Sequence, residues 1–378
     1  MPLVKSYEGL TQTYPNHKGL IVCCDANSSD DTKDVFLNSP SPIPRVYLST
    51  PPGDNLKIHC LFNLLHFAKR LKAKAIVALD GDLASVKRTW IGRLAEPILS
   101  GNASLTVPFY HALKFDTPVT NLLAYPLFRA LFGRRLRFPF DTDRAFSWEL
   151  NDLFLSYDRW PESENYQAAE MTMNLLAIAN KARICQSFMA TPRVNWQNRP
   201  VDPSMCAFFQ HITGTFFDFV EAYPELWLKH NRSRPTTVTG TNLVPVTISP
   251  RNISPPEIFL NEIKTITRQT SASWEKIFEN KNDSLFQEIA TASASDISVN
   301  TQHWSQIVYE SALAYRRLDT TQRKTLLAGL TAVFLGRLLT WLREGKNLTN
   351  SQLEAQTEEE ARIFEVEKKI LVDQWSAR

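Results

Sequence analysis

The first half of the chain alternates short apolar runs with amphipathic stretches. Four of the apolar runs have the length of β-strands, at residues 20–24, 45–48, 75–79 and 104–109. Between them, residues 56–71 repeat apolar side chains at the three- and four-residue spacing of a helix, and residues 90–99 predict a second helix. Because strands and helices alternate, we predict an α/β fold with a Rossmann-like, mostly parallel sheet flanked by helices.

From about residue 120 onward the pattern is mostly helical. The strongest helix predictions are residues 120–133, 166–181 and 204–222. Residues 232–256 are rich in Thr, Pro and Asn and predict an extended connector, whereas the charged residues 352–369 predict a solvated helix. We therefore expect an α/β domain at residues 1–230, a linker at residues 231–256 and a helical C-terminal region at residues 257–378. The pattern gives this last region no chemical role.

Composition and charge exclude several classes of protein. The 378 residues are 43% hydrophobic, and 42 Lys and Arg face 39 Asp and Glu, for a net charge of +3. This balance favours neither a nucleic-acid-binding protein nor a polybasic membrane-surface protein. We also expect no transmembrane segment and no signal peptide, because the apolar runs are too short or too interrupted. Five scattered cysteines without a Cys-x-x-Cys motif predict reduced thiols, and a cytoplasmic protein is expected.

Two of the predicted strands end in aspartates, and ligands bind at the carboxyl ends of strands in such sheets. Asp80-Gly81-Asp82 directly follows residues 75–79. Carboxylates one residue apart can face one Mg²⁺ or Mn²⁺ ion, which would neutralise a leaving diphosphate. The alternative is an ordinary solvated turn. The position of the motif directly after an apolar strand favours the site.

A second polar segment, residues 25–32 (DANSSDDT), follows the first strand. Its carboxylates and amides could hold the base and ribose of a nucleotide, with Asp25, Ser28 and Asp30 as the candidates. Alternatively, it is an ordinary loop whose Ser and Asp residues cap the next helix. Local chemistry leaves both interpretations open.

Two further candidates lie beyond the first four strands. Arg137 belongs to the basic residues 134–137, which could bind a phosphate or a carboxylate of an acceptor or form a solvated loop. Glu170 opens an amphipathic segment, where it could act as a catalytic base, contact an acceptor, or place negative charge at a helix N-terminus. His211 lies beside two Phe residues and is interpreted as a packed side chain.

Taken together, these segments resemble the GT-A glycosyltransferase family that includes glucosyl-3-phosphoglycerate synthase and mannosylglycerate synthase. Residues 25–32 are similar to its Asp-Gly-x-Ser-x-Asp-x-Thr loop, and Asp80-Gly81-Asp82 is similar to its Asp-x-Asp motif. Residues 115–121 (FDTPVTN) resemble the region that leads to its acceptor site, and residues 209–216 (FQHITGTF) resemble one of its helices. In the same family an Asp stands where this chain has Glu170, ahead of a helix that is expected to end at residues 183–186.

The resemblance implies a retaining, metal-dependent transfer of a hexose. The donor would be a UDP- or GDP-sugar, and the acceptor would be glycerate, a phosphoglycerate or a similar small polar molecule. The implied residues are Asp25, Ser28, Asp30, Asp80, Gly81 and Asp82 for the nucleotide sugar, Thr120 and Asn121 for the acceptor, and Arg137 and Glu170 for catalysis. Because the family tends to dimerise, a homodimer is a candidate state.

The chain departs from the family pattern in four places. The first strand of the family, with its Pro-x-x-Asn-like turn, is expected to be missing, since Met1 falls after it. A Gly-Gly pair is replaced within residues 140–143 (FDTD), and Glu170 stands in place of Asp. A metal-binding His is expected about ten residues past Cys185, where Asn195 offers only an amide oxygen.

The implied metal ligands are therefore Asp80, Asp82 and Asn195, around Mg²⁺ or Mn²⁺. The departures also support an alternative function. In that alternative the chain is a catalytically impaired relative that binds a nucleotide sugar or a protein.

Overall fold

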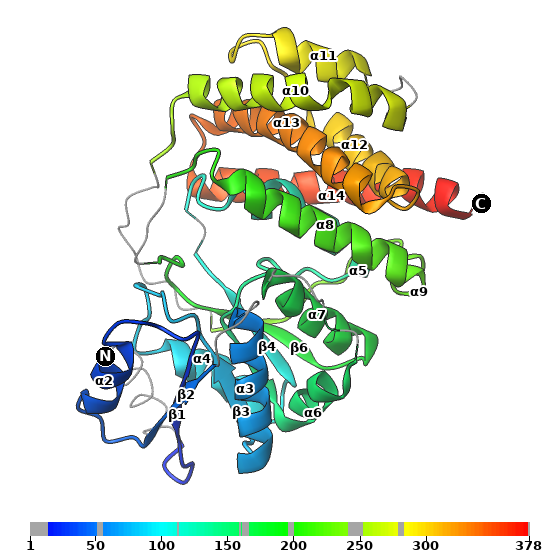
Figure 1. The fold of residues 1–378 in the computed structure, drawn as a ribbon. Helices are drawn as coiled ribbons and strands as arrows, with labels where there is room; N and C mark the ends of the chain where they lie inside the picture. The colour runs from blue at the N-terminus through cyan, green and yellow to red at the C-terminus, as the bar shows by residue number, and fades with distance from the viewer. Residues whose placement is uncertain are drawn as a thin grey trace. The chain divides into compact units, whose positions relative to one another are not determined.

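In a computed structural model, the structure describes residues 14–50, 56–111, 113–158, 160, 166–195, 200–240, 252–278 and 283–376. The chain divides into two compact units, each discontinuous in sequence, and each is considered by itself (Figure 1). The first unit comprises Met1–His111, Phe138–Gln197 and Thr236–Val246. The second comprises Ala112–Arg137, Asn198–Pro235 and Thr247–Arg378.

The described strands of the first unit form two sheets. In the smaller sheet, β1 (Ile21–Asp25) pairs in parallel with β2 (Arg45–Ser49). The larger sheet has the order β3 (Ala75–Ala78), β5 (Arg144–Ser147), β4 (Leu105–Phe109), β6 (Ile184–Phe188) and β7 (Val238–Thr239). Strands β4, β6 and β7 are parallel neighbours, whereas β5 runs antiparallel between β3 and β4. The predicted α/β class is confirmed, with a mixed sheet.

Helices flank the strands of the first unit. They are α2 (Thr32–Asn38), α3 (Leu56–Leu71), α4 (Trp90–Leu99), α6 (Trp148–Ser156) and α7 (Tyr166–Ala179). Helix α4 packs against β3, β4, β5 and β6, because Trp90, Leu94 and Ile98 recur at four-residue spacing and are all buried. The indole N–H of Trp90 donates to the hydroxyl of Thr191 at 3.1 Å, so burial leaves that donor satisfied. Helices α3, α6 and α7 pack on one another.

Two parts of the first unit differ from the sequence-based expectation. Residues 183–186 were expected to end a helix, but α7 ends at Ala179 and residues 184–188 form the buried strand β6. The helix stops because Lys181 adopts a left-handed conformation, with a φ of 55°, and the chain then pairs with β4. Strand β5 and helix α6 were not predicted.

The second unit is helical apart from short bridges in its described residues. It contains the π-helical turn η1 (Thr120–Ala124), α5 (Tyr125–Phe132), α8 (Met205–Ala222), α9 (Pro224–Trp227), α10 (Pro256–Phe278), α11 (Asp283–Thr291), α12 (Thr301–Tyr315), α13 (Thr320–Gly345) and α14 (Asn350–Ser376). Helices α5 and α8 pack against the C-terminal helices. The sequence predicted a domain boundary at residue 230, which placed α5 and α8 in the α/β domain. In the structure both helices belong to the second unit. Part of the expected linker, residues 241–251, lies outside the described residues.

Helix α13 is the centre of the second unit. By length and composition it could cross a membrane, but 83% of its apolar stretch is buried inside the protein, as in a core helix. It packs against α8, α10, α11 and α12.

Helix α14 was expected to be solvated, but one of its faces is buried. Leu353, Phe364 and Leu371 pack inside, and Glu360 and Lys368 are also covered. The charged pattern therefore describes only the outer face of this helix. The five cysteines are free thiols, as expected.

Candidate functional site

A cluster of charged and polar side chains lies at the end of the five-stranded sheet where β3, β4 and β6 finish. Asp80 follows β3, Tyr110 follows β4 and Arg193 comes shortly after β6. Because β5 runs antiparallel, Asp143, which precedes it, reaches the same end. This is the end where ligands bind in open α/β sheets.

Asp143 is the buried centre of the cluster. Its carboxyl group has no exposed surface, and its Oδ1 accepts the backbone N–H of Asp80 at 3.0 Å. Its Oδ2 accepts the hydroxyl of Tyr110 and the Nε–H of Arg193, the latter at 3.1 Å. Burial raises the pKa of Asp143 above its usual range, and Arg193 and Tyr110 oppose that shift. A carboxylate buried this deeply requires such partners.

Arg193 connects three of the polar residues. Its Nη2 donates to Asp80 Oδ2 at 2.9 Å and its Nη1 donates to Asn195 Oδ1 at 2.6 Å, while its Nε bonds Asp143. Asp141 Oδ1 lies 4.0 Å from the same Nε. Burial alone would lower the pKa of Arg193, but the neighbouring carboxylates outweigh it and the pKa is raised. The guanidinium therefore stays charged at every working pH.

The Asp-x-Asp turn is fixed to the segment that carries Arg193. Within the turn, Asp80 Oδ1 accepts the backbone N–H of Asp82 at 3.2 Å. Beyond it, the N–H of Ala84 donates to the carbonyl of Val194 at 2.8 Å, and the N–H of Val194 donates to Ser85 Oγ at 2.9 Å. A freely solvated turn would lack these constraints, so the backbone that carries Asp80 and Asp82 is held in place by hydrogen bonds.

The predicted metal ligands do not fit a divalent ion in this arrangement. Within the described part of the chain, no group of three or more His, Cys, Asp or Glu side chains is placed to hold a metal. Asp80 and Asn195 both hydrogen-bond Arg193, so an ion between them would lie against a guanidinium. Two positive charges in contact repel each other. Asp82 alone of the three makes no side-chain hydrogen bond or ion pair with the residues that the structure describes.

Glu170, on α7, is a buried carboxyl group of the same unit. It is 2% exposed, and its Oε1 has no hydrogen-bond partner among the described residues. Burial raises its pKa to about 8, although Arg144 and a hydrogen bond with Thr142 favour the charged form. At neutral pH the group is therefore mostly protonated. A pKa in this range suits a general acid or base.

The loop after β1 satisfies its own polar groups. Both carboxylate oxygens of Asp25 accept hydrogen bonds from Ser28, one from its N–H at 2.6 Å and one from its hydroxyl at 2.7 Å. Asp30 Oδ1 accepts the N–H of Thr32 at 3.0 Å, at the start of α2. These bonds are those of an ordinary loop, but the N-cap residue of α2, Asp31, makes no side-chain cap hydrogen bond, so the predicted helix capping is not seen at that residue. Nucleotide binding by Asp25, Ser28 and Asp30 stays a prediction.

The predicted acceptor residues, Thr120 and Asn121, belong to the second unit, where Asn121 contacts Arg137. Asn121 Oδ1 accepts from Arg137 Nη2 at 2.6 Å, and Thr120 opens η1 beside it. Arg137 also donates to both carboxylate oxygens of Glu354 on α14, at 2.7 and 2.9 Å. Arg137 as a whole is 2% exposed. Its charge is thus already neutralised by a residue that the sequence did not single out.

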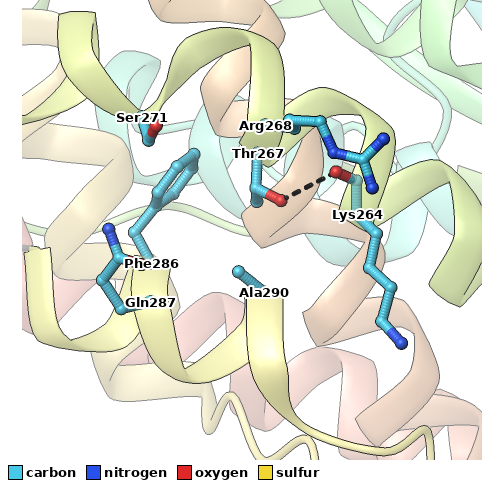
Figure 2. A pocket seen from close by; sticks show the side chains of 7 residues that line it. All are labelled: Lys264, Thr267, Arg268, Ser271, Phe286, Gln287 and Ala290. Atoms are coloured by element: carbon cyan, nitrogen blue, oxygen red, sulfur yellow. Dashed lines mark hydrogen bonds between the residues drawn. The ribbon is translucent and has the colours of Figure 1, made fainter.

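Two described pockets lie in the second unit, and none of the predicted site residues lines either one. The first has a volume of about 270 Å³ and lies between α10 and α11 (Figure 2). Its cationic side chains, Lys264 and Arg268, are exposed. The second, of about 800 Å³, is largely apolar and includes Phe259, Leu260 and Leu339. Neither pocket brings together groups suited to catalysis.

Four residues were not identified as site candidates from the sequence. Tyr110, Asp143 and Arg193 belong to the cluster around Asp80, and Glu354 is the partner of Arg137. Tyr110 directly follows an apolar strand, as Asp80 does, so its position could have been used to find it. Asp143 was noted only as part of residues 140–143, which replace the Gly-Gly pair of the family. Arg193 and Glu354 are single charged residues without a motif around them.

Comparisons with known proteins gave matches only among solved structures. No family model and no curated protein matches the chain. It is similar to glucosyl-3-phosphoglycerate synthase from Mycobacterium tuberculosis in complex with phosphoglyceric acid, with 22% identity and a TM-score of 0.42 over 57% of this chain and 74% of that one. The same synthase with Mn²⁺, UDP-glucose and phosphoglyceric acid gives 20% identity and a TM-score of 0.42, over 66% and 84% of the two chains. A further mycobacterial protein gives 19% and 0.40, over 58% and 69%.

The motifs in the sequence resemble the family that includes this synthase. At these identities and TM-scores, the structural likeness by itself carries no activity over to the chain.

Proposed function

We propose that the chain is a glycosyltransferase of the GT-A type, which binds a nucleoside diphosphate sugar and transfers its hexose to a small polar acceptor. The observation that carries the proposal is the Asp-x-Asp turn at the carboxyl edge of the sheet, held by Asp143 and Arg193. Its two carboxylates differ in their surroundings. Asp80 is bonded to Arg193, whereas the Asp82 carboxylate is open to hydroxyl groups of a donor.

The proposed reaction needs positioning and charge stabilisation more than covalent chemistry by the protein. The bond between the anomeric carbon and the diphosphate oxygen breaks, and the nucleoside diphosphate leaves with the electron pair. The acceptor hydroxyl oxygen forms the new bond to carbon, and its proton passes to the departing diphosphate oxygen. Fixed dipoles and charges at the leaving group lower the barrier of such a step. Glu170, mostly protonated at neutral pH, would donate a hydrogen bond in this environment.

The choice of substrates for a first test follows the similar synthase, whose structure contains UDP-glucose and phosphoglyceric acid. We propose UDP- and GDP-sugars as donors, and glycerate or phosphoglycerate as acceptors with Thr120 and Asn121 on the acceptor side. The predicted dependence on Mg²⁺ or Mn²⁺ is not part of this proposal, because Asp80 and Asn195 are both hydrogen-bonded to Arg193 and do not fit an ion. A cytoplasmic location and a homodimer remain predictions.

Calorimetry with UDP-glucose and GDP-mannose, combined with detection of released nucleoside diphosphate in the presence of phosphoglycerate, tests the proposal. We expect one donor to bind and Asp82→Asn to weaken its binding by roughly tenfold or more, the effect of a lost charged hydrogen bond. Asp152→Asn, at an exposed ion pair with Lys69, is the matched control. The proposal fails if no donor binds the parent, or if Asp82→Asn binds as tightly as the parent.

A second candidate function is a nucleotide-sugar-binding module without transfer activity. It is favoured by the pairing of Arg137 with Glu354, because this pair leaves the predicted acceptor-binding cation neutralised. Donor binding without release of nucleoside diphosphate, for every acceptor tried, would identify this function.

A further inference from the structure

In the first unit, the positively charged guanidinium of Arg193 lies between side chains that were predicted to bind a metal ion. Asp80 and Asn195, two of the three predicted ligands, are both bonded to Arg193. We propose that Arg193 replaces the divalent ion and binds the diphosphate of the nucleotide sugar directly. Donor binding would then need no metal. This inference rests on the proposed function and assigns its electrostatic role to one residue.

The guanidinium retains donors for a ligand. An arginine side chain has five N–H groups. One from each nitrogen bonds Asp143, Asn195 or Asp80, so that one N–H on Nη1 and one on Nη2 have no partner among the residues that the structure describes. The side chain is 20% exposed, unlike the fully buried Asp143 behind it. Paired N–H groups on a planar guanidinium are suited to two oxygens of a phosphate.

The surroundings hold this guanidinium in a fixed position. Asp143 is anchored by the Tyr110 hydroxyl and by the backbone of Asp80, so it cannot follow Arg193 outward. The backbone at Val194 is bonded to Ala84 and Ser85 on the other side. A cation fixed before the ligand arrives needs no reorganisation when charge develops on a leaving diphosphate.

A metal would have to displace this arrangement. An ion that used Asp80 and Asn195 would require Arg193 to give up both bonds and move away. Asp143, which has no exposed surface, would then lose its ion pair, and an unpaired buried carboxylate is strongly disfavoured. The parent protein should therefore bind Mn²⁺ poorly. Removal of Arg193 should free Asp80 and Asn195 for it.

The first experiment measures binding of UDP, GDP, UDP-glucose and GDP-mannose to the full chain, in EDTA and in Mn²⁺ or Mg²⁺. We expect the affinity for the preferred nucleotide to agree within about twofold between the two conditions. Binding that appears only with a divalent ion overturns the metal-free site but leaves the proposed function intact. Absence of binding in every condition overturns both.

Two variants test the role of Arg193 itself. We expect Arg193→Gln to weaken nucleotide binding in EDTA by roughly 10- to 100-fold, the range for a charged hydrogen bond, and Arg193→Lys to weaken it less. Arg183→Gln, at an exposed position of the same unit, should bind as the parent does. Unchanged binding in the Lys and Gln variants would overturn the proposal.

Mn²⁺ electron paramagnetic resonance without nucleotide gives a readout independent of the ligand. We expect the parent to leave Mn²⁺ free in solution and Arg193→Gln to bind it. The substitution frees Asp80 Oδ2 and Asn195 Oδ1, which accept hydrogen bonds from Arg193 in the parent. If Arg193→Gln fails to fold, Arg193→Lys still reports on the nucleotide. Strong Mn²⁺ binding by the parent would show that the guanidinium does not occupy the site in solution.

Discussion

Replacement of Glu170 by Gln tests the buried part of the first unit quantitatively. Burial raises the pKa of this carboxyl group from 4.5 to about 8. Between those two values the folded protein holds a proton that the unfolded chain has released. The free energy of unfolding of the parent therefore falls as pH rises through this window. Gln has the same shape and no charge, so the variant lacks this loss.

The size of the effect follows from the shift. The difference of 8 − 4.5 is about 3.5 pKa units, and each unit corresponds to about 1.4 kcal/mol, which gives about 5 kcal/mol in total. About 3.5 kcal/mol of this falls between pH 5 and pH 8, because the lowest and highest parts of the titration lie outside that interval. Relative to the parent, Glu170→Gln should thus gain about 3.5 kcal/mol in stability over these three pH units.

Urea unfolding followed by circular dichroism, at pH 5, 6, 7 and 8, measures the difference between parent and variant. Glu149→Gln, on the exposed side of α6, is the matched control and should show no such trend. Parallel pH curves for Glu170→Gln and the parent would refute the reasoning, since they would mean that Glu170 is ionised in the folded protein. Because the role proposed for Glu170 needs its proton, the transfer rate should fall as pH rises through about 8.

Two further substitutions test packing and charge elsewhere. Glu354→Ala should lower the free energy of unfolding by about 3 kcal/mol, because it leaves the buried guanidinium of Arg137 without its carboxylate; a loss well under 1 kcal/mol in urea unfolding would contradict this. Gly329→Ala should destabilise by about 1–3 kcal/mol, since its Cβ would lie 2.5 Å from Trp274 Cε3. Gly92→Ala, in α4 with nothing within 4 Å, should instead stabilise by about 0.5–1 kcal/mol. Equal shifts in thermal unfolding for the two glycine variants would contradict the packing argument.

The elements that the sequence predicted well have long apolar periodicity and clear ends. Helix α3 spans residues 56–71 and α4 spans residues 90–99, as predicted. In α4 the apolar side chains recur every four residues, and Gly101, with a φ of 72°, follows the end of the helix. Such local features act within one turn of chain, so a sequence records them directly.

The elements that were missed depend on contacts far apart in sequence. Strand β5 has only four residues, and its place in the sheet is set by pairing with residues 75–78 and 105–106. The same is true of the site. The position of Asp80 was predicted from its strand, but its partner Arg193 lies more than a hundred residues later and has no motif of its own. Proximity of this kind is created by the fold and leaves no local pattern.

The order of strands in the larger sheet determines how early this sheet can form while the chain is being synthesised. Strands β3 and β4 both emerge from the ribosome before β5, yet β5 lies between them, so neither can complete its pairing at that stage. The intervening residues 112–137 belong to the second unit, where α5 packs against α14, which is synthesised much later than α5. Each unit thus waits for a late segment of chain. A shortened gene that ends after residue 230 would leave α5 without α14, so deletion of the C-terminal helices is a poor route to the minimal form of this protein.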